Sequence, residues 1–151
     1  VSHNMMPEGL LHFGLRETLE NYCENLNKSG VINVQLQTYG LHERMSRDTE
    51  IALYRIVQEL LGNVITHSGA THVLVQLTKE GNQFSLTVED DGKGFDKVLV
   101  LKSGHSGIAN IESRVSLLNG SVDFNTAPGQ GTSVTVIGRC DTVCADLNPS
   151  I

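Results

Sequence analysis

The chain has 151 residues, of which 39% are hydrophobic, with 15 glycines and no tryptophan, which is the composition of a single α/β domain long enough to bury a core. The formal net charge of −6 argues against nucleic acid as a partner, because proteins that bind phosphate backbones carry basic patches. No apolar run reaches the ~18 residues of a membrane span and no signal peptide is visible, so we expect a cytoplasmic domain without membrane contact, whether or not its parent protein is membrane anchored.

The first half of the chain predicts two helices separated by a strand. Residues 1–9, VSHNMMPEG, form a turn-like lead-in broken by a proline and a glycine. Residues 10–30 predict a helix, and residues 31–38 alternate apolar and polar side chains as a half-buried strand does. Ser46 or Asp48 can cap a long helix that follows. The apolar positions of the first helix are Leu11, Leu15, Leu19, Tyr22, Cys23 and Leu26.

The second half predicts four strands and one short helix. The strands are expected at residues 71–79, 83–90, 121–126 and 132–139, and an amphipathic helix is expected at 108–120. A glycine-punctuated stretch with little periodicity, residues 90–107, precedes that helix, and the tail from 140 to 151 has no period. This order predicts an α+β fold with a largely antiparallel sheet and helices on one face, without the βαβ alternation of dinucleotide-binding folds.

Three polar side chains interrupt the long helix, whose apolar pattern runs from about Ile51 to His67. At ~100° per residue, Glu59 lies beside the apolar sector, Asn63 near its edge and His67 inside it. Burial without partners costs ~1–3 kcal/mol for each group, so we expect all three to have partners. They either form an edge stripe that binds loops or line a site for hydrated Mg²⁺, which needs only one or two protein oxygens.

The stretch VEDDGKGFD carries a second candidate site. Counting from Asp90, the sixth residue is Phe95 rather than glycine and the twelfth is Leu101 rather than glutamate, which excludes an EF-hand. A plain Asp-Gly turn is the simpler alternative, but a long loop follows instead of a matched strand, and such loops often bind ligands. The loop ends in SGHSG at the start of a helix, where exposed amides favour anions.

The order of these features resembles the ATP-binding domain of the GHKL superfamily (gyrase, heat-shock chaperone, histidine kinase, MutL), and within it the catalytic domain of sensor histidine kinases of the NarX/DesK-like type. Glu59 and Asn63 in QELLGN match the family's N box, and His67 fits a variant of its end. The three glycine boxes are matched by Asp90, Gly92 and Gly94, by Gly104, Gly107 and Ile108, and by Gly129, Gly131 and Thr132. Asp91, where the family more often has Asn, and Ser106, which interrupts a Gly-x-Gly spacing, depart from the pattern.

The resemblance implies a two-layer α/β sandwich of the Bergerat type that binds ATP with Mg²⁺. Asn63 would hold the metal, and Glu59 would be the catalytic residue, polarising a water or supporting the ion. Asp90 would accept a hydrogen bond from the adenine amino group, a role that suits an acceptor-only carboxylate. The further ATP contacts implied are His67, Gly92, Gly94, Gly104, His105, Ser106, Gly107, Ile108, Gly131 and Thr132.

The resemblance also implies a division of the chain and an activity. Residues 1–9 would connect to dimerisation helices, 10–139 would be the catalytic domain and 140–151 a tail. The domain would transfer the γ-phosphate of ATP to a histidine on those helices, with a response regulator downstream. No phosphoacceptor motif like ELHD occurs, so we expect negligible autophosphorylation by this chain alone. The alternatives are a gyrase- or MutL-type ATPase, an anti-sigma-type serine kinase and a degenerate nucleotide-binding module.

Overall fold

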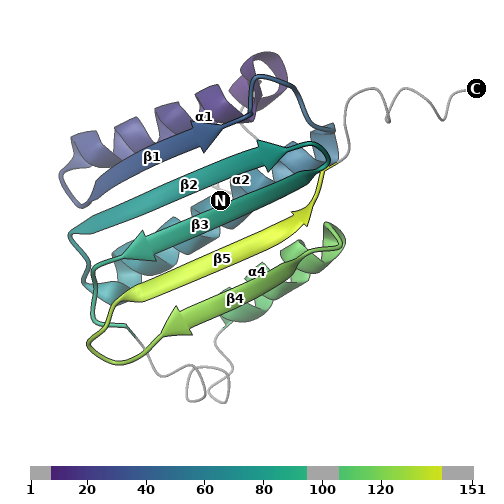
Figure 1. Cartoon of the computed structure of the whole chain (residues 1–151). Coiled ribbons are helices and arrows are strands. Elements are labelled where there is room, and N and C mark those ends of the chain that lie inside the picture. The colour runs from purple at the N-terminus through teal and green to yellow at the C-terminus, as the bar shows by residue number, and fades with distance from the viewer. Residues whose placement is uncertain (1–7, 95–105, 141–151) are drawn as a thin grey trace, which may run out of the picture.

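The computed structural model of the protein describes residues 8–94 and 106–140, which form one five-stranded sheet with helices packed on one face (Figure 1). This confirms the expected two-layer α+β arrangement. The elements are α1 (Glu8–Ser29), β1 (Asn33–Tyr39), α2 (Arg47–Asn63), the π-helix η2 (Val64–Ser68), β2 (His72–Glu80), β3 (Gln83–Asp90), α4 (Ser106–Leu117), β4 (Ser121–Thr126) and β5 (Thr132–Arg139). Within the described ranges, no helix combines the length and apolar character needed to cross a bilayer.

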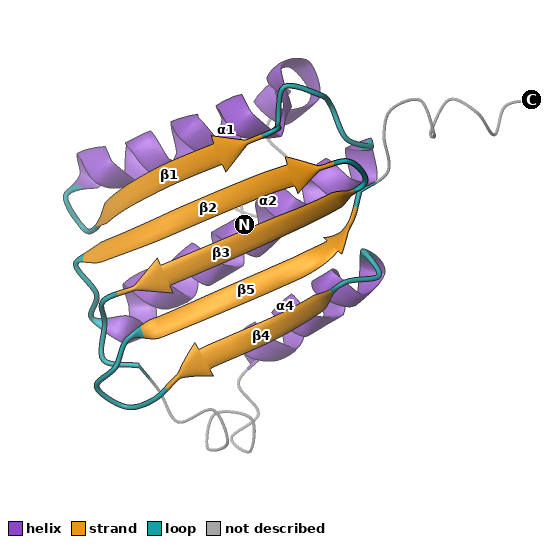
Figure 2. Cartoon of the chain, in the orientation of Figure 1, coloured by secondary structure: helices purple, strands orange, loops and turns teal. Residues whose placement is uncertain are grey.

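The sheet is mixed and mostly antiparallel, as the sequence predicts. Its strand order is β1-β2-β3-β5-β4; the pairing of β1 with β2 is parallel, and the other three pairings in the described sheet are antiparallel (Figure 2). A parallel neighbour requires a crossover connection, and α2 supplies it between β1 and β2. The strand β3 lies in the middle of the sheet, with β2 on one side and β5 on the other.

Alternation along the strands builds the core against α2. Every second residue of β2 and β3 is buried, and α2 turns its own apolar side chains towards them. The helix begins where Ser46, one of the two expected caps, accepts a hydrogen bond from the amide of Thr49 at 3.2 Å. The buried apolar residues of α2 are Leu53, Tyr54, Ile56, Val57, Leu60 and Leu61.

The first helix differs from the prediction of one continuous helix over 10–30. Its backbone is non-helical at Gly14, where φ is 88° and ψ is 176°. The break rotates the preceding turn, so that Leu10 is buried at 1% exposure whereas Leu11, expected on the apolar face, is 42% exposed. The prediction for Leu11 is therefore wrong, because a 3.6-residue period cannot be carried through a break.

The long helix also ends differently. Regular α-helix stops at Asn63, and the wider turn of η2 carries the chain from Val64 to Ser68. Residues advance by less than 100° each in such a turn, so His67 is exposed and does not lie inside the apolar sector as expected. The hydroxyl of Ser68 donates to the carbonyl of Val64 at 2.7 Å and stabilises this final turn.

Candidate functional site

The residues that follow β3, 91–94, form a glycine turn between two other segments. On one side, the amide of Lys93 donates to the carbonyl oxygen of Ser68 at 2.8 Å, at the end of η2. On the other side, the amide of Gly129, in the turn between β4 and β5, donates to the carbonyl oxygen of Lys93. The glycine turn thus joins the end of the long helix to the last glycine-rich turn of the chain.

Gly92 and Gly94 permit this close packing. A Cβ atom on Gly92 would lie 2.5 Å from the carbonyl oxygen of Ser68, and one on Gly94 would overlap the carbonyl oxygen of Ala127. Gly94 also has a φ of 69°, which side chains rarely tolerate. Both glycines of the stretch are therefore required by the contacts of the backbone, which favours a built site over a plain turn.

Asp90, the last residue of β3, presents a half-buried carboxylate beside the glycine turn. Its Oδ1 atom accepts a hydrogen bond from the amide of Gly92 at 2.8 Å, and its backbone pairs with that of Thr132 in β5. Burial raises the pKa of the Asp90 carboxyl above its ordinary value, hydrogen bonds from the backbones of Gly92 and Thr132 lower it, and the charge of Asp91 raises it further. The group is poised to accept a hydrogen bond from a ligand that carries a donor.

Asp91, one of the two departures from the family pattern, has a different role. Its Oδ1 accepts hydrogen bonds from the amides of Thr71 and His72 at 2.9 and 3.0 Å, and its Oδ2 lies 3.1 Å from Thr71 Oγ1 and 3.3 Å from His72 Nδ1. These bonds lower the pKa of the Asp91 carboxyl to about 2. Asp91 therefore fixes the start of β2 with both of its oxygens.

Glu59 and Asn63 lie on one side of α2, because a four-residue step brings side chains onto the same helix face. Both are half-buried, and Asn63 is the last α-helical residue, one turn before the contact of Ser68 with the glycine turn. His67, in η2, does not continue this row. Among the described residues, no cluster of three or more His, Cys, Asp or Glu side chains forms a ready metal site. One amide and one carboxylate oxygen fit Mg²⁺, which takes further ligands from water and phosphates.

Thr132 and the unpredicted Thr126 anchor the last glycine-rich turn. Their hydroxyl oxygens are 2.9 Å apart, and Thr126 Oγ1 also donates to the carbonyl oxygen of Gly131 at 3.2 Å. The two threonines are cross-strand partners at the ends of β4 and β5. A tight hairpin at APGQG could have indicated this pairing from the sequence, whereas the contacts of Ser68 depend on the π turn and have no sequence signal.

The remaining predicted residues belong to the start of α4 and to the segment before it. Gly104 and His105 lie outside the described residues, and Ser106, Gly107 and Ile108 form the first turn of α4. The structure thus brings together Asp90, Gly92, Gly94, Gly131 and Thr132 around the glycine turn, next to the helix end that carries Asn63.

The chain is similar to known proteins over most of its length. Residues 48–139 match the sequence family described as histidine kinase-, DNA gyrase B-, and HSP90-like ATPase. The chain is 35% identical over 136 residues to the signal transduction histidine-protein kinase/phosphatase DegS of Brevibacillus brevis, covering 90% of this chain and 35% of DegS. It is 33% identical over 130 residues to the sensor histidine kinase ComP of Bacillus subtilis, covering 85% of this chain and 17% of ComP.

A solved structure shares the fold. The histidine kinase domain of the blue-light activated histidine kinase EL346 from Erythrobacter litoralis matches with a TM-score of 0.65 and 22% identity, over 82% of this chain and 64% of that domain. The chain spans between 17% and 35% of the lengths of the curated relatives it matches, which are longer proteins.

Proposed function

Because the chain belongs to the histidine kinase-, DNA gyrase B-, and HSP90-like ATPase family, we propose that it binds ATP at Asp90 and transfers the γ-phosphoryl group to a histidine outside this chain. It is homologous to the catalytic domains of sensor histidine kinases. The kinase activity of a longer parent protein, its dimerisation helices and a response regulator as downstream partner are parts of the proposal. The names of the relatives favour it over the ATPase and serine kinase alternatives.

One observation carries the proposal: the carboxylate of Asp90 is held at the end of a central strand, half-buried, with one oxygen bound by the amide of Gly92. An ionised carboxylate only accepts hydrogen bonds, and the exocyclic amine of adenine donates them. The glycine turn fixes this carboxylate between the end of η2 and the last glycine-rich turn, since Gly92 and Gly94 pack directly against the carbonyl oxygens of Ser68 and Ala127. These features support recognition of the base at this point.

The end of α2 would hold the phosphates through Mg²⁺. The amide oxygen of Asn63 is the proposed ligand, and Glu59, one turn earlier, would orient a water or support the ion. When bound, the metal neutralises charge that develops on the phosphates during transfer. The amides of the first turn of α4, at Ser106 and Gly107, are suited to phosphate oxygens because helix N-termini favour anions.

Transfer of the phosphoryl group to histidine depends mainly on the positions of ATP and the acceptor. The imidazole nitrogen forms a bond to the γ-phosphorus while the bond to the β–γ bridging oxygen breaks, and ADP leaves with that electron pair. This chain would bind and orient ATP, and the acceptor would come from the other domain. With no ELHD-like motif in the sequence, the chain alone should incorporate negligible phosphate. Robust labelling of a histidine in the isolated chain would contradict this part of the proposal.

A binding measurement with two nucleotides tests the role of Asp90. We expect isothermal titration calorimetry to show that wild type prefers ATP over GTP, because guanine presents a carbonyl oxygen where adenine presents its amine. Asp90→Ala should weaken ATP binding about 10- to 100-fold, as expected for losing a hydrogen bond to a charged group. Asp90→Asn should reduce the preference for ATP over GTP, since a side-chain amide can donate a hydrogen bond as well as accept one.

The control is Asp123→Asn, at an exposed position of β4, which should leave both affinities unchanged. Equal binding of ATP and GTP by wild type, or unchanged ATP affinity in Asp90→Ala, would reject the assignment of the base to this carboxylate. Absence of ATP binding in wild type would favour the degenerate module.

A further inference from the structure

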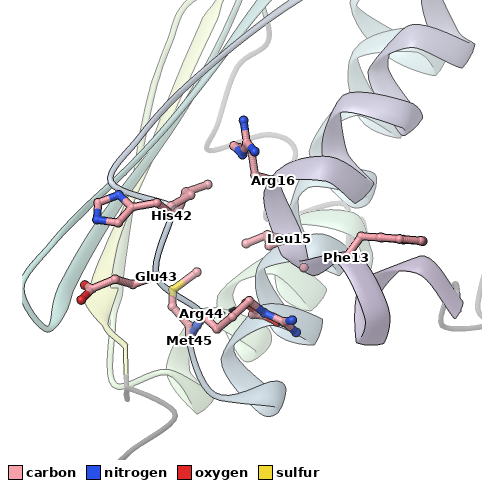
Figure 3. Close-up of a pocket in the computed structure, with 10 residues that line it drawn as sticks. Phe13, Leu15, Arg16, His42, Glu43, Arg44 and Met45 are labelled. Atoms are coloured by element: carbon pink, nitrogen blue, oxygen red, sulfur yellow. Dashed lines mark hydrogen bonds and ion pairs between the residues drawn. The ribbon is translucent and has the colours of Figure 1, made fainter.

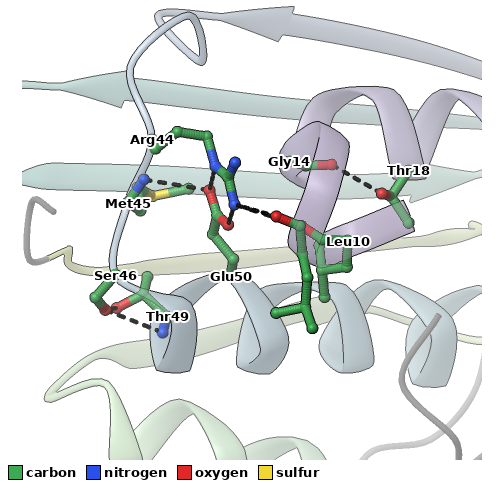
Figure 4. A network of polar contacts seen from close by, with 9 residues as sticks. Leu10, Gly14, Thr18, Arg44, Met45, Ser46, Thr49 and Glu50 are labelled. Carbon is green, nitrogen blue, oxygen red and sulfur yellow. Dashed lines mark hydrogen bonds and ion pairs between the residues drawn. The ribbon is translucent and has the colours of Figure 1, made fainter. Parts of the chain in front are cut away.

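The backbone break in α1 at Gly14 is connected to the start of α2 through Arg44 and Glu50, and this connection is called the joint below. The joint lies at the opposite end of the sheet from Asp90 (Figure 1). The backbone of α1 breaks at Gly14, whose φ of 88° and ψ of 176° are accessible to glycine and to few other residues. The hydroxyl of Thr18 donates to the carbonyl oxygen of Gly14 at 2.8 Å, at the start of the second piece of the helix (Figure 4). α1 therefore consists of two pieces that meet at this residue.

Arg44, from the loop between β1 and α2, fills the break. Its Nη2 atom donates to the carbonyl oxygens of Leu10 and Leu11 at 3.4 and 3.5 Å, at the end of the first piece (Figure 4). Carbonyls in the last turn of a helix lack amide partners, so Arg44 acts as their cap. A Cβ atom on Gly14 would lie 3.2 Å from Arg44 Cδ and Nε, which shows how closely the arginine lies on the broken backbone.

Glu50, in α2, holds the arginine in place. Its carboxylate is 4% exposed and binds Arg44 through two hydrogen bonds, Nε to Oε2 at 3.1 Å and Nη2 to Oε1 at 2.9 Å. Oε2 also accepts from the amide of Met45 at 3.2 Å. A bidentate pair fixes the plane of the guanidinium as well as its position, and the buried carboxylate depends on that pairing.

The described side chains of the first piece of α1 differ in burial. Leu10 is buried in the core, but Leu11 and Phe13 are 42% and 63% exposed. Beside the joint, Phe13, Leu15, Arg16, His42 and Arg44 line a pocket open to solvent (Figure 3). The direction of the first piece thus depends on one apolar anchor and on the capped break.

We propose that Arg44, held by Glu50, is a positioning residue that sets the angle between the two pieces of α1, and so the direction in which the chain enters the domain. The inference rests on the proposed function in one respect: the acceptor histidine would be connected to the domain through the segment before Gly14. Loss of the cap would leave ATP binding intact, because the nucleotide site is at the other end of the sheet, but would misplace the acceptor.

Amide hydrogen exchange on this chain tests the joint without any phosphorylation. In Arg44→Gln, we expect amides within residues 10–15 to exchange about tenfold faster, while β3 and β5 keep their protection. Arg44→Lys retains one charged contact, so its amide exchange rates at residues 10–15 should lie between those of wild type and Arg44→Gln. The matched control is Arg16→Gln. Arg16 lines the same pocket and, within the part of the chain that the structure describes, pairs with Glu20 at 3.8 Å on the surface, so the variant should exchange as wild type does.

Unchanged exchange in Arg44→Gln, or faster exchange spread evenly over the sheet, would overturn the proposal. If that variant does not fold, Arg44→Lys carries the test by the same criterion. Gly14→Ala provides an independent check, because its Cβ atom and positive φ should displace Arg44 and reproduce the local effect.

Phosphorylation by the full-length parent protein tests the consequence. We expect Arg44→Gln to lower the rate constant for histidine phosphorylation about tenfold with the KM for ATP within about twofold of wild type, and Arg44→Lys to recover part of the rate. Arg16→Gln should match wild type. Equal rates in wild type and Arg44→Gln would refute the positioning role. A wild-type parent that phosphorylates no histidine would instead refute the proposed function, and the exchange experiment would still decide the structure of the joint.

Discussion

Asp90 and Asp91 are neighbours in sequence but have opposite surroundings. The first is half-buried with a raised pKa, whereas the second is exposed and binds two backbone amides, so its pKa is lowered to about 2. A motif of two acidic residues therefore contains one group suited to a ligand and one that fixes the strand beside it. The family motif in the sequence indicates Asp90 as a candidate contact, whereas the contacts of Asp91 depend on where β2 begins.

The lowered pKa of Asp91 predicts a component of stability that depends on pH. The folded value is below the ordinary 3.8, so the contribution of its hydrogen bonds is complete above pH about 4 and is lost as the pH falls from about 4 to about 2. Asp91→Asn should lack this component. Urea unfolding across this window should then show a shallower loss of the free energy of unfolding than in wild type.

The comparison for Asp91 uses Asp123→Asn as the control, because Asp123 is exposed on an edge strand. The free energy of unfolding of Asp123→Asn should depend on pH as that of wild type does. An identical pH dependence for wild type and Asp91→Asn would show that the ionisation of Asp91 contributes nothing to stability.

At the scale of elements, α2 offers a change that should stabilise the fold. Gly62 lies inside the helix, and a Cβ atom added there would meet nothing within 4 Å. Replacing a helical glycine with alanine reduces the entropy of the unfolded chain, so Gly62→Ala should raise the free energy of unfolding by about 0.5–1 kcal/mol. Urea denaturation measures this directly.

Gly94→Ala is the contrasting substitution for Gly62→Ala, because the turn there needs a positive φ and leaves no space beside Ala127. It should destabilise the protein in the same assay. Destabilisation by Gly62→Ala would mean that the last turns of α2 are not regular helix.

The strands were the most predictable elements. The expected ranges for β3, β4 and β5 agree with the observed ones to the residue, since strict alternation ends at turn residues on both sides. The parallel pairing of β1 and β2 was not predicted, because alternation gives the face of a strand and not its neighbour.

The helices show where local patterns fail. A glycine within an apolar period fits both a helix and a break, and the contact that stabilises the break at Gly14 comes from Arg44, thirty residues later. Likewise, the π turn that moves His67 out of the apolar sector depends on the hydrogen bonds of Ser68. These features result from tertiary contacts, which a helical period does not contain.

At the scale of the whole molecule, net charge bears on the proposed metal. The chain carries a formal net charge of −6 and the proposed ligand is a polyanion, so the proposed divalent cation would offset repulsion between them. Removing Mg²⁺ with EDTA should weaken ATP binding by wild type about tenfold or more, measured by calorimetry at matched ionic strength. Asn63→Ala should bind ATP with nearly equal affinity in both conditions.

Asn125→Ala, an exposed position of β4, is the matched control for Asn63 and should keep the full dependence on Mg²⁺. A dependence as large in Asn63→Ala as in wild type would remove Asn63 from the metal site. Wild-type binding that does not respond to EDTA would remove the metal from the proposal.

One helix reaches both ends of the domain. Glu50 lies in the first turn of α2 and binds Arg44 at the joint, whereas Asn63 is the final α-helical residue, near the glycine turn. At the rise of an α-helix, these two residues are about 20 Å apart along the helix axis. Because a packed helix moves as a rigid body, its two ends cannot tilt independently. A tilt of α2 would therefore move both the joint at Gly14 and the proposed metal ligand Asn63, and the buried apolar face of the helix against β2 and β3 resists such a tilt.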